Sequence, residues 1–191
     1  MVLSDRTIKD EIAKGRIIIE PLIPGCIQPA SVDLHLDKKL LVFKPQRHPA
    51  YIDVRRSLDH LNDLVELDED EAFLLDPGEF VLVSTLELIT LPDDVVGRLE
   101  GKSSLGRIGL LIHSTAGYVD PGWQGNLTIE LSNVAKLPIT LYYKMKIGQI
   151  SFLRLTSPVD RLYGTAELGS KYQGQTEPTA SKYYEDIVKG S

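Results

Sequence analysis

The chain begins with a helical pattern of apolar residues and continues with patterns typical of strands. Residues 4–15 place Ser4 where a helix N-cap is expected, Ile8 and Ile12 one turn apart, and Gly15 at the end, which predicts a short amphipathic helix. The runs that follow are short or alternating and are separated by Pro, Gly and Asp: RIIIEPLIP, SVDLHLDKKLLVF, EAFLLDPGEFVLVSTLELITLP, GNLTIELSN and LPITLYYKMKIGQISFLRL. Many short strands at close spacing predict a mainly β fold, a sandwich or a barrel.

Two segments depart from this strand pattern. Residues 57–71 (SLDHLNDLVELDEDE) are acidic with leucines at roughly helical spacing, so we expect either a helix or a solvated loop. After Pro158 the apolar periodicity fades, and residues 159–191 are interpreted as a tail with little core of its own. Because no internal repeat or domain boundary is visible, we expect a single domain over residues 1–191 that includes this tail.

Composition narrows the class of protein. A chain of 191 residues with 42% hydrophobic content can bury a core and is not typical of disorder. The single cysteine, Cys26, excludes an internal disulfide framework, and no leader or long apolar span is visible, so we expect a soluble, cytoplasmic protein with no membrane partner. The formal net charge of −6 argues against binding to nucleic acid. An anionic ligand would therefore need a local cationic pocket or a metal ion.

The segment SSLGRIGLLIHSTAGYVDPGW, residues 103–123, interrupts an apolar run with small and polar residues. Within GKSSLGR, residues 101–107, hydroxyls, exposed amides and two cations suit a polyphosphate, although the spacing is not that of a P-loop. Its glycines are equally typical of hairpin turns. His113 has no partner visible in the sequence, and a packed structural role is the simpler interpretation.

The alternation of apolar and polar residues along two predicted strands shows which face of each strand carries a carboxylate. In residues 127–132 (LTIELS) the apolar side chains share one face, and Glu130 lies on the other. Glu130 therefore points either into solvent or into a pocket. Taken alone, a solvated strand face is the better interpretation for Glu130, and also for Asp33 in SVDLHL, because carboxylates are seldom buried unless they are paired.

Together these fragments resemble the dCTP deaminases of the dUTPase-like superfamily. GKSSLGR, TAGYVDPGW and IELSN carry the resemblance, which extends from LSDRTIKDEI to GSKYQGQ over nearly the whole chain. The resemblance implies a distorted jelly-roll β-barrel, a homotrimer with active sites between subunits, and hydrolytic removal of ammonia from the cytosine of dCTP. In such a trimer, Arg107 of a neighbouring subunit could bring positive charge to the triphosphate.

The sequence lacks the signature of zinc-dependent deaminases. Those enzymes use HxE and PCxxC motifs, whereas this chain has one cysteine and no histidine in such a pattern, so we expect no zinc. A deaminase without zinc needs a carboxylate to move protons between water and the leaving nitrogen, and Glu130 is the candidate. The resemblance implies that the Ser103 hydroxyl and the Ala116 carbonyl orient the water, and that backbone around Thr128 and Ile129 contacts the pyrimidine.

The resemblance also implies how the rest of the nucleotide is bound. The phosphate-binding residues would be Lys102, Ser103, Ser104, Leu105, Gly106 and Arg107. Position 102 is a lysine where many relatives have arginine. Its single ammonium group replaces a planar guanidinium that could bind phosphate through two nitrogens. Asp120 would hold the 3′-hydroxyl, Trp123 would lie near the sugar, and Gln149 would contact the base.

The tail would then be a flexible lid, and simple disorder is the alternative. Tyr163, Lys171 and Gln175 match residues of a C-terminal segment that folds over the phosphates in the family. Magnesium is expected as the counterion of the triphosphate, bound through phosphate oxygens and water, with no protein metal site.

The pair after Ala116 bears on the product. Relatives that only deaminate tend to carry bulky basic residues there, whereas Gly117 and Tyr118 resemble the bifunctional branch. We therefore expect deamination of dCTP followed by cleavage of dUTP to dUMP and diphosphate in the same site, which would supply dUMP for dTMP synthesis. Asp120 would orient or deprotonate the second water, and dTTP is a possible feedback inhibitor. The alternatives are a deaminase that releases dUTP, a pure dUTPase, and a nucleotide-binding module without catalysis.

Overall fold

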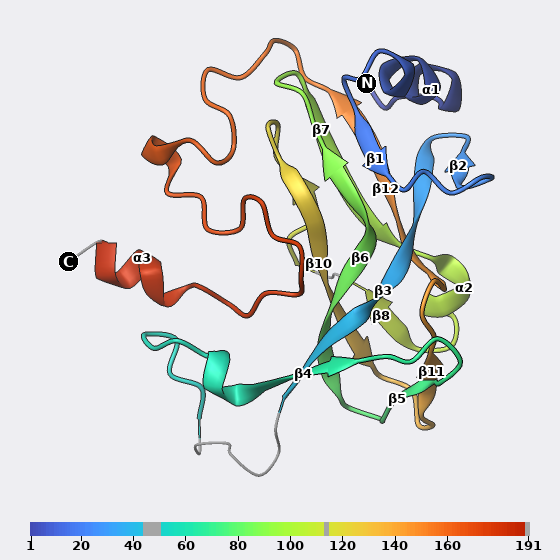
Figure 1. Ribbon diagram of the computed structural model, residues 1–191, viewed down its shortest axis with the longest axis vertical. Coiled ribbons are helices and arrows are strands. Elements are labelled where there is room, and N and C mark those ends of the chain that lie inside the picture. Colours follow the sequence, from blue (N-terminus) through green and yellow to red (C-terminus); the bar gives the residue numbers. More distant parts are fainter. Residues whose placement is uncertain (44–50, 113–114, 190–191) are drawn as a thin grey trace.

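The predicted strands form an antiparallel sheet that curls into a barrel (Figure 1). The structure is a computed structural model that describes residues 1–43, 51–112 and 115–189. The strands are β1 (Ile18–Glu20), β2 (Ile27–Gln28), β3 (Ser31–Phe43), β4 (Asn62–Glu66), β5 (Phe73–Leu75), β6 (Phe80–Thr90), β7 (Val95–Gly101), β8 (Leu110–Ile112), β9 (Tyr118–Val119), β10 (Gln124–Asn133), β11 (Ile139–Leu141) and β12 (Lys146–Arg154). The helices are α1 (Asp5–Ala13), α2 (Ser103–Gly106) and α3 (Tyr184–Lys189), with 3-10 turns at Asp59–Leu61 and Ala166–Leu168. The predicted mainly β class with a short N-terminal helix is confirmed.

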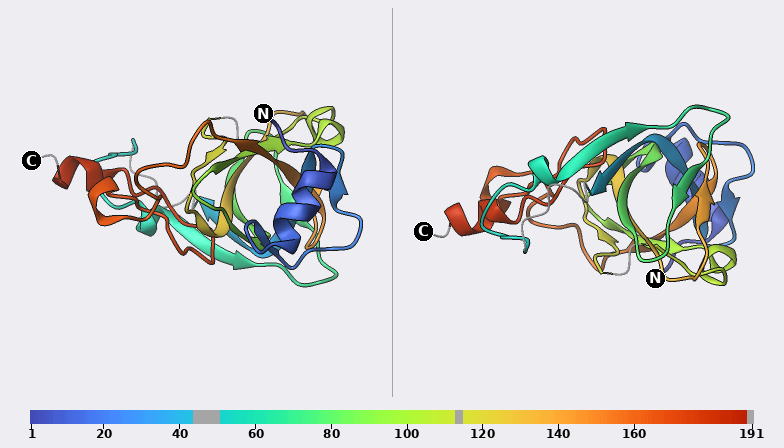
Figure 2. Two further views of the ribbon diagram at one scale, coloured as in Figure 1. Left: turned by 90° about the horizontal axis from the view of Figure 1, so that it is seen from above. Right: turned by 90° about the horizontal axis from the view of Figure 1, so that it is seen from below.

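The order of the strands brings the two ends of the sheet together. Across the main sheet the order is β8-β10-β6-β3-β12-β7-β9, and β1, β2 and β4 pair with strands along this path. Figure 2 shows the strands arranged around the barrel axis. At the seam, a Cβ on Gly101 of β7 would lie 3.5 Å from Cβ of Ile112 in β8, and the Leu99 amide donates to the Gly117 carbonyl at 2.7 Å. The segment that resembled a nucleotide-binding motif therefore lies along this seam.

The alternation of β10 separates the core from the outer surface. Leu127, Ile129 and Leu131 are buried inside the barrel, where each contributes about 1.5–3 kcal/mol through burial of its side chain. Thr128 and Glu130 are half-buried and point to the other face, as the sequence predicts. A site that includes Glu130 must therefore lie on the outside of the barrel wall.

Helix α1 begins and ends where the sequence predicts. The Ser4 side chain accepts a hydrogen bond from the Thr7 amide at 3.5 Å, and Gly15 adopts a φ of 69° just beyond the helix. Ile8 is fully buried and attaches the helix to the barrel core, near the upper end in Figure 1.

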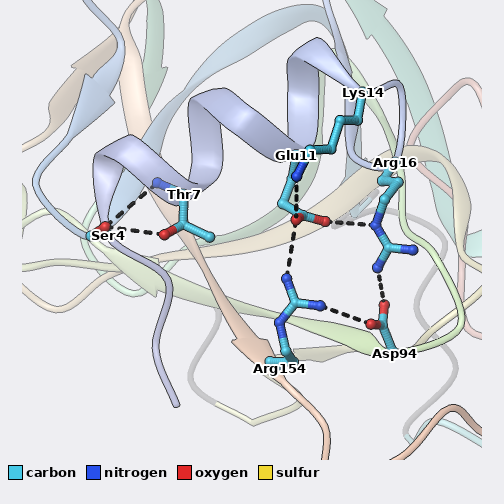
Figure 3. A network of polar contacts seen from close by, with 7 residues as sticks. All are labelled: Ser4, Thr7, Glu11, Lys14, Arg16, Asp94 and Arg154. Carbon is cyan, nitrogen blue, oxygen red and sulfur yellow. Dashed lines mark hydrogen bonds and ion pairs between the residues drawn. The ribbon is translucent and has the colours of Figure 1, made fainter.

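A network of ion pairs ties α1 to two distant parts of the barrel (Figure 3). Arg16 bridges Glu11 at 2.7 Å and Asp94 at 2.5 Å, and Arg154 bridges the same two carboxylates at 3.1 and 2.9 Å. Glu11 is almost fully buried, whereas both arginines are about one-third exposed. Hydrogen bonding to Arg16 and Arg154 holds the pKa of Glu11 below its ordinary value, despite burial that pushes it up. The network therefore fixes the helix, the β6–β7 turn and the end of β12 together.

The acidic segment 57–71 forms neither the helix nor the solvated loop that its pattern predicts. After the 3-10 turn, β4 pairs with β3 in the register Leu40↔Val65. Leu61 and Leu67 are buried at the two ends of this strand, whereas Leu64 is exposed, so the leucines do not share a helical face. The edge of β3 offers backbone partners that an isolated acidic segment lacks, and pairing with them overrides the weak helical spacing.

Residues 159–189 of the tail run back along the outside of the barrel to β10, at the left of Figure 1. The Gly174 amide donates to the Gln124 carbonyl at 2.8 Å, and the Gln175 carbonyl accepts from the Asn126 amide at 2.9 Å. Helix α3 is half-buried to exposed, and Ala180 of the tail is buried, so the tail packs on the barrel. None of the described helices has the length and apolar content to span a membrane.

Replacement of Glu11 by Gln tests the ion-pair network. The variant loses a buried carboxylate between two arginines that water can still reach, so we expect a loss of about 1–3 kcal/mol in the free energy of unfolding at pH 7. Because the folded pKa of Glu11 is depressed, this contribution is present above the ordinary carboxyl pKa and is lost as pH falls through the folded value. Urea unfolding from pH 7 to pH 3 should therefore show the wild type and Glu11→Gln converging in acid. Asp5→Asn, which removes an exposed pair with Lys9 on the same helix, should change little. Equal losses in both variants would contradict the role of the network.

Candidate active site

A cavity of about 450 Å³ lies between the outer face of β10 and the tail. Its volume is within the usual range for small-molecule sites. The wall is formed by β6, β10 and the seam, and the roof is formed by residues of the tail. The lining residues are Phe43, Leu58, Asn62, Phe80, Leu82, Leu99, Ala116, Tyr118, Val119, Asp120, Trp123, Leu127, Thr128, Glu130, Tyr163, Tyr172, Gln175, Thr179, Ala180 and Ser181.

Glu130 is held at the middle of the cavity wall. The Thr115 hydroxyl donates to Oε2 of Glu130 at 3.3 Å, and Thr128 is anchored by the Thr179 amide, which donates to its hydroxyl at 3.2 Å. Ile129 points the other way, into the barrel, so only its backbone can face a ligand. The carboxylate thus combines partial burial with an orienting hydrogen bond, which suits a group that transfers protons.

The turn between β9 and β10 presents Asp120 and Trp123 at one side of the cavity. Trp123 is only 6% exposed, and its indole N–H donates to the Gly125 carbonyl at 3.1 Å. Its ring lies 5.5 Å from that of Tyr163 in the tail, at a tilt of 48°. Asp120 is exposed at the cavity, and the next carbonyl, that of Pro121, accepts from the Tyr163 amide at 2.9 Å. An acid and an aromatic plane are therefore fixed side by side.

Two glycines allow the tail to approach this wall closely. Gly122 has a φ of 86°, and a Cβ there would lie 2.7 Å from Cβ of Leu162. Gly125 has a φ of 146°, and a Cβ there would lie 2.7 Å from the carbonyl oxygen of Gln175. Both positions combine a conformation that disfavours side chains with space that only glycine leaves open.

The Gly117–Tyr118 pair lies at the seam of the barrel beside Glu130. A Cβ on Gly117 would lie 3.2 Å from the Leu99 carbonyl oxygen, so the backbone passes close to β7. Tyr118 is 63% exposed and lines the cavity together with Ala116. His113 and Ser114, just before this pair in the chain, lie outside the described residues.

The predicted phosphate loop, residues 102–107, lies elsewhere on the same chain. Helix α2 follows β7, and Ser103, Ser104, Gly106 and Arg107 are exposed. Among the described residues, none of this loop lines the cavity around Glu130. Gln149 also lies near the loop, where its side-chain amide donates to the Gly101 carbonyl at 3.5 Å. The predicted site residues are thus divided into two groups within one chain.

Two of the three predicted lid residues reach the cavity. Burial raises the pKa of Tyr163, which lines the cavity beside Trp123. The side chain of Gln175 donates to the Asn126 carbonyl at 2.9 Å, while its own side-chain oxygen is buried without a partner among the described residues. Lys171 forms an ion pair with Asp186 instead, and this hydrogen bond raises its pKa. A phosphate contact for Lys171 stays a prediction.

Comparison with known proteins identifies the family. The family model described as dCTP deaminase-like matches residues 2–155. The chain belongs to the dCTP deaminase family. Proteins named "dCTP deaminase, dUMP-forming" from Mycolicibacterium paratuberculosis and Nocardia farcinica are 57% and 59% identical to it, over 98% and 96% of this chain and 98% and 92% of theirs. A crystal structure of 2'-deoxycytidine 5'-triphosphate deaminase from Agrobacterium tumefaciens superposes with a TM-score of 0.62 at 28% identity, over 81% of this chain and 47% of that one.

The resemblance to dCTP deaminases and the mainly β fold that it implied are therefore confirmed. For this dCTP deaminase family member, the sequence missed several cavity residues, including Leu58, Phe80 and Tyr172, and it missed Thr115, which donates to Glu130. They come from separate strands, turns and the tail, and no local spacing in the sequence links them. Among the described residues, no three His, Cys, Asp or Glu side chains come together as metal ligands.

The expectation that Asp33 is solvated is wrong. Its side chain is 2% exposed and pairs with Lys102 and Lys146, which supply the compensation that a buried carboxylate requires. A second buried acid, Glu87, contacts His35, whose ring Nδ1 lies 2.5 Å from its carboxylate, and burial raises the pKa of Glu87. Neither pairing could be predicted, because each joins strands that are distant in the sequence.

Proposed function

We propose that this chain is a dUMP-forming dCTP deaminase that performs two hydrolyses in one site. The first converts dCTP and water to dUTP and ammonia, and the second converts dUTP and water to dUMP and diphosphate. The observation that carries the proposal is the cavity in which Glu130 and Asp120 are the carboxylates, in a chain 56–59% identical to relatives with this name. The resemblance of Gly117 and Tyr118 to the bifunctional branch agrees with those names.

Deamination requires a water molecule to attack C4 of the cytosine while the exocyclic nitrogen gains a proton. Glu130 takes a proton from this water and returns it to the leaving nitrogen, and the Thr115 hydroxyl keeps the carboxylate aimed at the cavity. The Ala116 carbonyl and the Ser103 hydroxyl orient the water, and the backbone at Thr128 and Ile129 contacts the pyrimidine edge. The tilted rings of Trp123 and Tyr163 enclose the sugar side.

The second hydrolysis takes place at the α-phosphate. Asp120 first accepts the 3′-hydroxyl and orients or deprotonates a second water, which attacks phosphorus and expels diphosphate. Gly117 leaves its backbone free of a side chain where the α-phosphate would lie, and Tyr118 stands where a basic residue would otherwise hold the triphosphate in place. A deaminase that releases dUTP remains the alternative reading of this loop.

A homotrimer completes the site from two chains. Loop 102–107 is exposed and lies outside the cavity of its own chain, so it is available to enter the cavity of a neighbour. Ser103, Ser104 and Arg107 would then supply donors and charge to the triphosphate, and Lys102, Leu105 and Gly106 would complete the loop. Within the described ranges Arg107 forms no ion pair, which leaves its guanidinium for phosphate.

Magnesium accompanies the triphosphate in this proposal. The carboxylates that line the cavity are Asp120 and Glu130, too few to hold the ion alone, so phosphate oxygens and water provide most of its ligands. When bound, magnesium would supply positive charge to the phosphates during cleavage of the phosphoanhydride. The lid closes over the phosphates through Tyr163, Gln175 and Lys171. Gln149 contacts the base from the neighbouring chain. The nucleotide dTTP acts as a feedback inhibitor. The single cysteine fits a cytoplasmic enzyme.

The first test follows both products of dCTP with magnesium, by chromatography of the nucleotides and assays of ammonia and diphosphate. Wild type should release ammonia and diphosphate in equal amounts with little free dUTP. Glu130→Gln should still bind dCTP in calorimetry but lose at least about a thousandfold in deamination, because the proton carrier is absent. Glu66→Gln, an exposed acid on β4, is the matched control and should keep full activity. Accumulating dUTP would favour the deaminase that stops after one step, and an active Glu130→Gln would remove that residue from its role.

The second test asks whether the site is shared between subunits. Glu130→Gln and Arg107→Ala chains should each be inactive, because each lacks one half of every site. Random co-assembly into trimers should restore about a quarter of the wild-type activity, since one site in four then joins two intact halves. Activity would be compared before and after co-refolding of equal amounts, with sedimentation to verify trimers. Absence of recovery in mixed trimers would show that both residues act within one chain.

A further inference from the structure

Asp33 is a buried carboxylate that the proposed reaction does not use. It lies in β3, and three side chains donate to it: Lys102 at 2.5 Å, Lys146 at 2.9 Å and Gln28 at 3.2 Å. Burial alone would raise the pKa of Asp33, but hydrogen bonds from the two lysines outweigh burial and hold the pKa below its ordinary value. Asp33 therefore stays negatively charged although its side chain is buried.

The partners of Asp33 join three strands to the predicted phosphate loop. Across the sheet, Asp33 of β3 is opposite Gln149 of β12, and Gln149 is opposite Glu100 of β7. Lys102, two residues beyond Glu100 at the N-terminus of α2, reaches back over β12 to Asp33. The ammonium of Lys102 is thus directed toward the sheet.

A second contact strengthens the same junction. The Ser31 hydroxyl donates to the side-chain oxygen of Gln149 at 3.1 Å, and the nitrogen of Gln149 donates to the Gly101 carbonyl. Directly beyond Gly101, the Lys102 carbonyl accepts hydrogen bonds from the Leu105 and Gly106 amides, each at 3.0 Å, and so begins the helical turn. The residue that opens α2 is therefore fixed through its side chain and its backbone.

From these contacts we infer that Asp33 is a positioning residue for the phosphate loop, acting through Lys102. Lys102 connects the sheet to α2 through its ion pair with Asp33. The turn that it holds carries Ser103, Ser104 and Arg107. This inference rests on the proposed function for its consequence in catalysis, but the position of the loop can be measured independently. It also changes the expected role of Lys102, whose charge is offset by Asp33 and is not free for phosphate.

Replacement of Asp33 by Asn separates positioning from simple electrostatics. Removing a negative charge beside two lysines makes the region more positive, so electrostatics alone would lower KM for dCTP. A displaced loop would instead raise KM and lower kcat/KM, on the order of tenfold or more. The two explanations therefore predict changes of opposite sign. Glu100→Gln is the matched control, because it removes the same charge from β7, which flanks β12 on the side opposite to β3, and Glu100 pairs there with the exposed Arg98. Its kcat/KM should stay within about twofold.

Hydrogen exchange measures directly how firmly the backbone of the loop is held, whether or not dCTP is the substrate. Amides of residues 105–107, which bond to the Lys102 and Ser103 carbonyls, should exchange at least about tenfold faster in Asp33→Asn than in wild type or Glu100→Gln. Lys102→Met, at a partly exposed side chain, should give the same acceleration, and the double variant should be no worse than Lys102→Met alone. If Asp33→Asn does not fold, Lys102→Met decides the question. Unchanged exchange with unchanged or lower KM would overturn the inference, whereas faster exchange without any dCTP turnover in wild type would refute only the proposed function.

Discussion

The alternation of side chains across a single barrel wall is the constraint on which this structure depends. Strand β10 sends Leu127, Ile129 and Leu131 into the core, and the same backbone must then send Thr128 and Glu130 outward. A shift of one residue in register would bury the carboxylate and expose the leucines. Stability and chemistry are therefore set by one pairing, between β10 and β6, in which Glu130 is opposite Leu82. The packed interior is the reason that the Glu130 carboxylate is held on an outer surface.

An outer surface gives little shelter to a reaction, and two features of the chain compensate for this. The tail forms a roof over β10, and the exposed α2 loop suits a role in a neighbouring copy. The ion pairs of Glu11 and Asp94 support the first feature, because the Asp94 carbonyl also accepts from the Leu155 amide where the tail leaves β12. The contacts of Asp33 support the second. Charged residues outside the cavity thus contact the segments that are expected to surround a nucleotide.

The sequence predicts the local features well because each has a local cause. Ser4 and Gly15 delimit α1, period-two alternation gives β3 and β10, and the glycine-rich segment forms the seam. It fails where distant segments decide. β4 exists because β3 offers it an edge, and Asp33 is buried because Lys102, 69 residues away, can reach it. The family resemblance supplied the candidate site residues, and the fold shows that they form two groups that lie apart in one chain.

The roof that the tail forms over β10 also bears on how long a bound nucleotide would stay in the cavity. Near the cavity the tail is attached by hydrogen bonds of Gly174, Gln175 and Thr179 to residues of β10, each contributing about 0.5–1.5 kcal/mol net, and by the packing of Tyr163 against Trp123. Opening of a lid of this kind generally takes microseconds to seconds. In the proposed reaction, a nucleotide enclosed beneath the tail would leave only when the segment lifts, so an intermediate would stay long enough to meet a second water before escape. The time for which the nucleotide stays bound, as much as the identity of the nucleophile, would then decide whether one bond or two are broken before it dissociates.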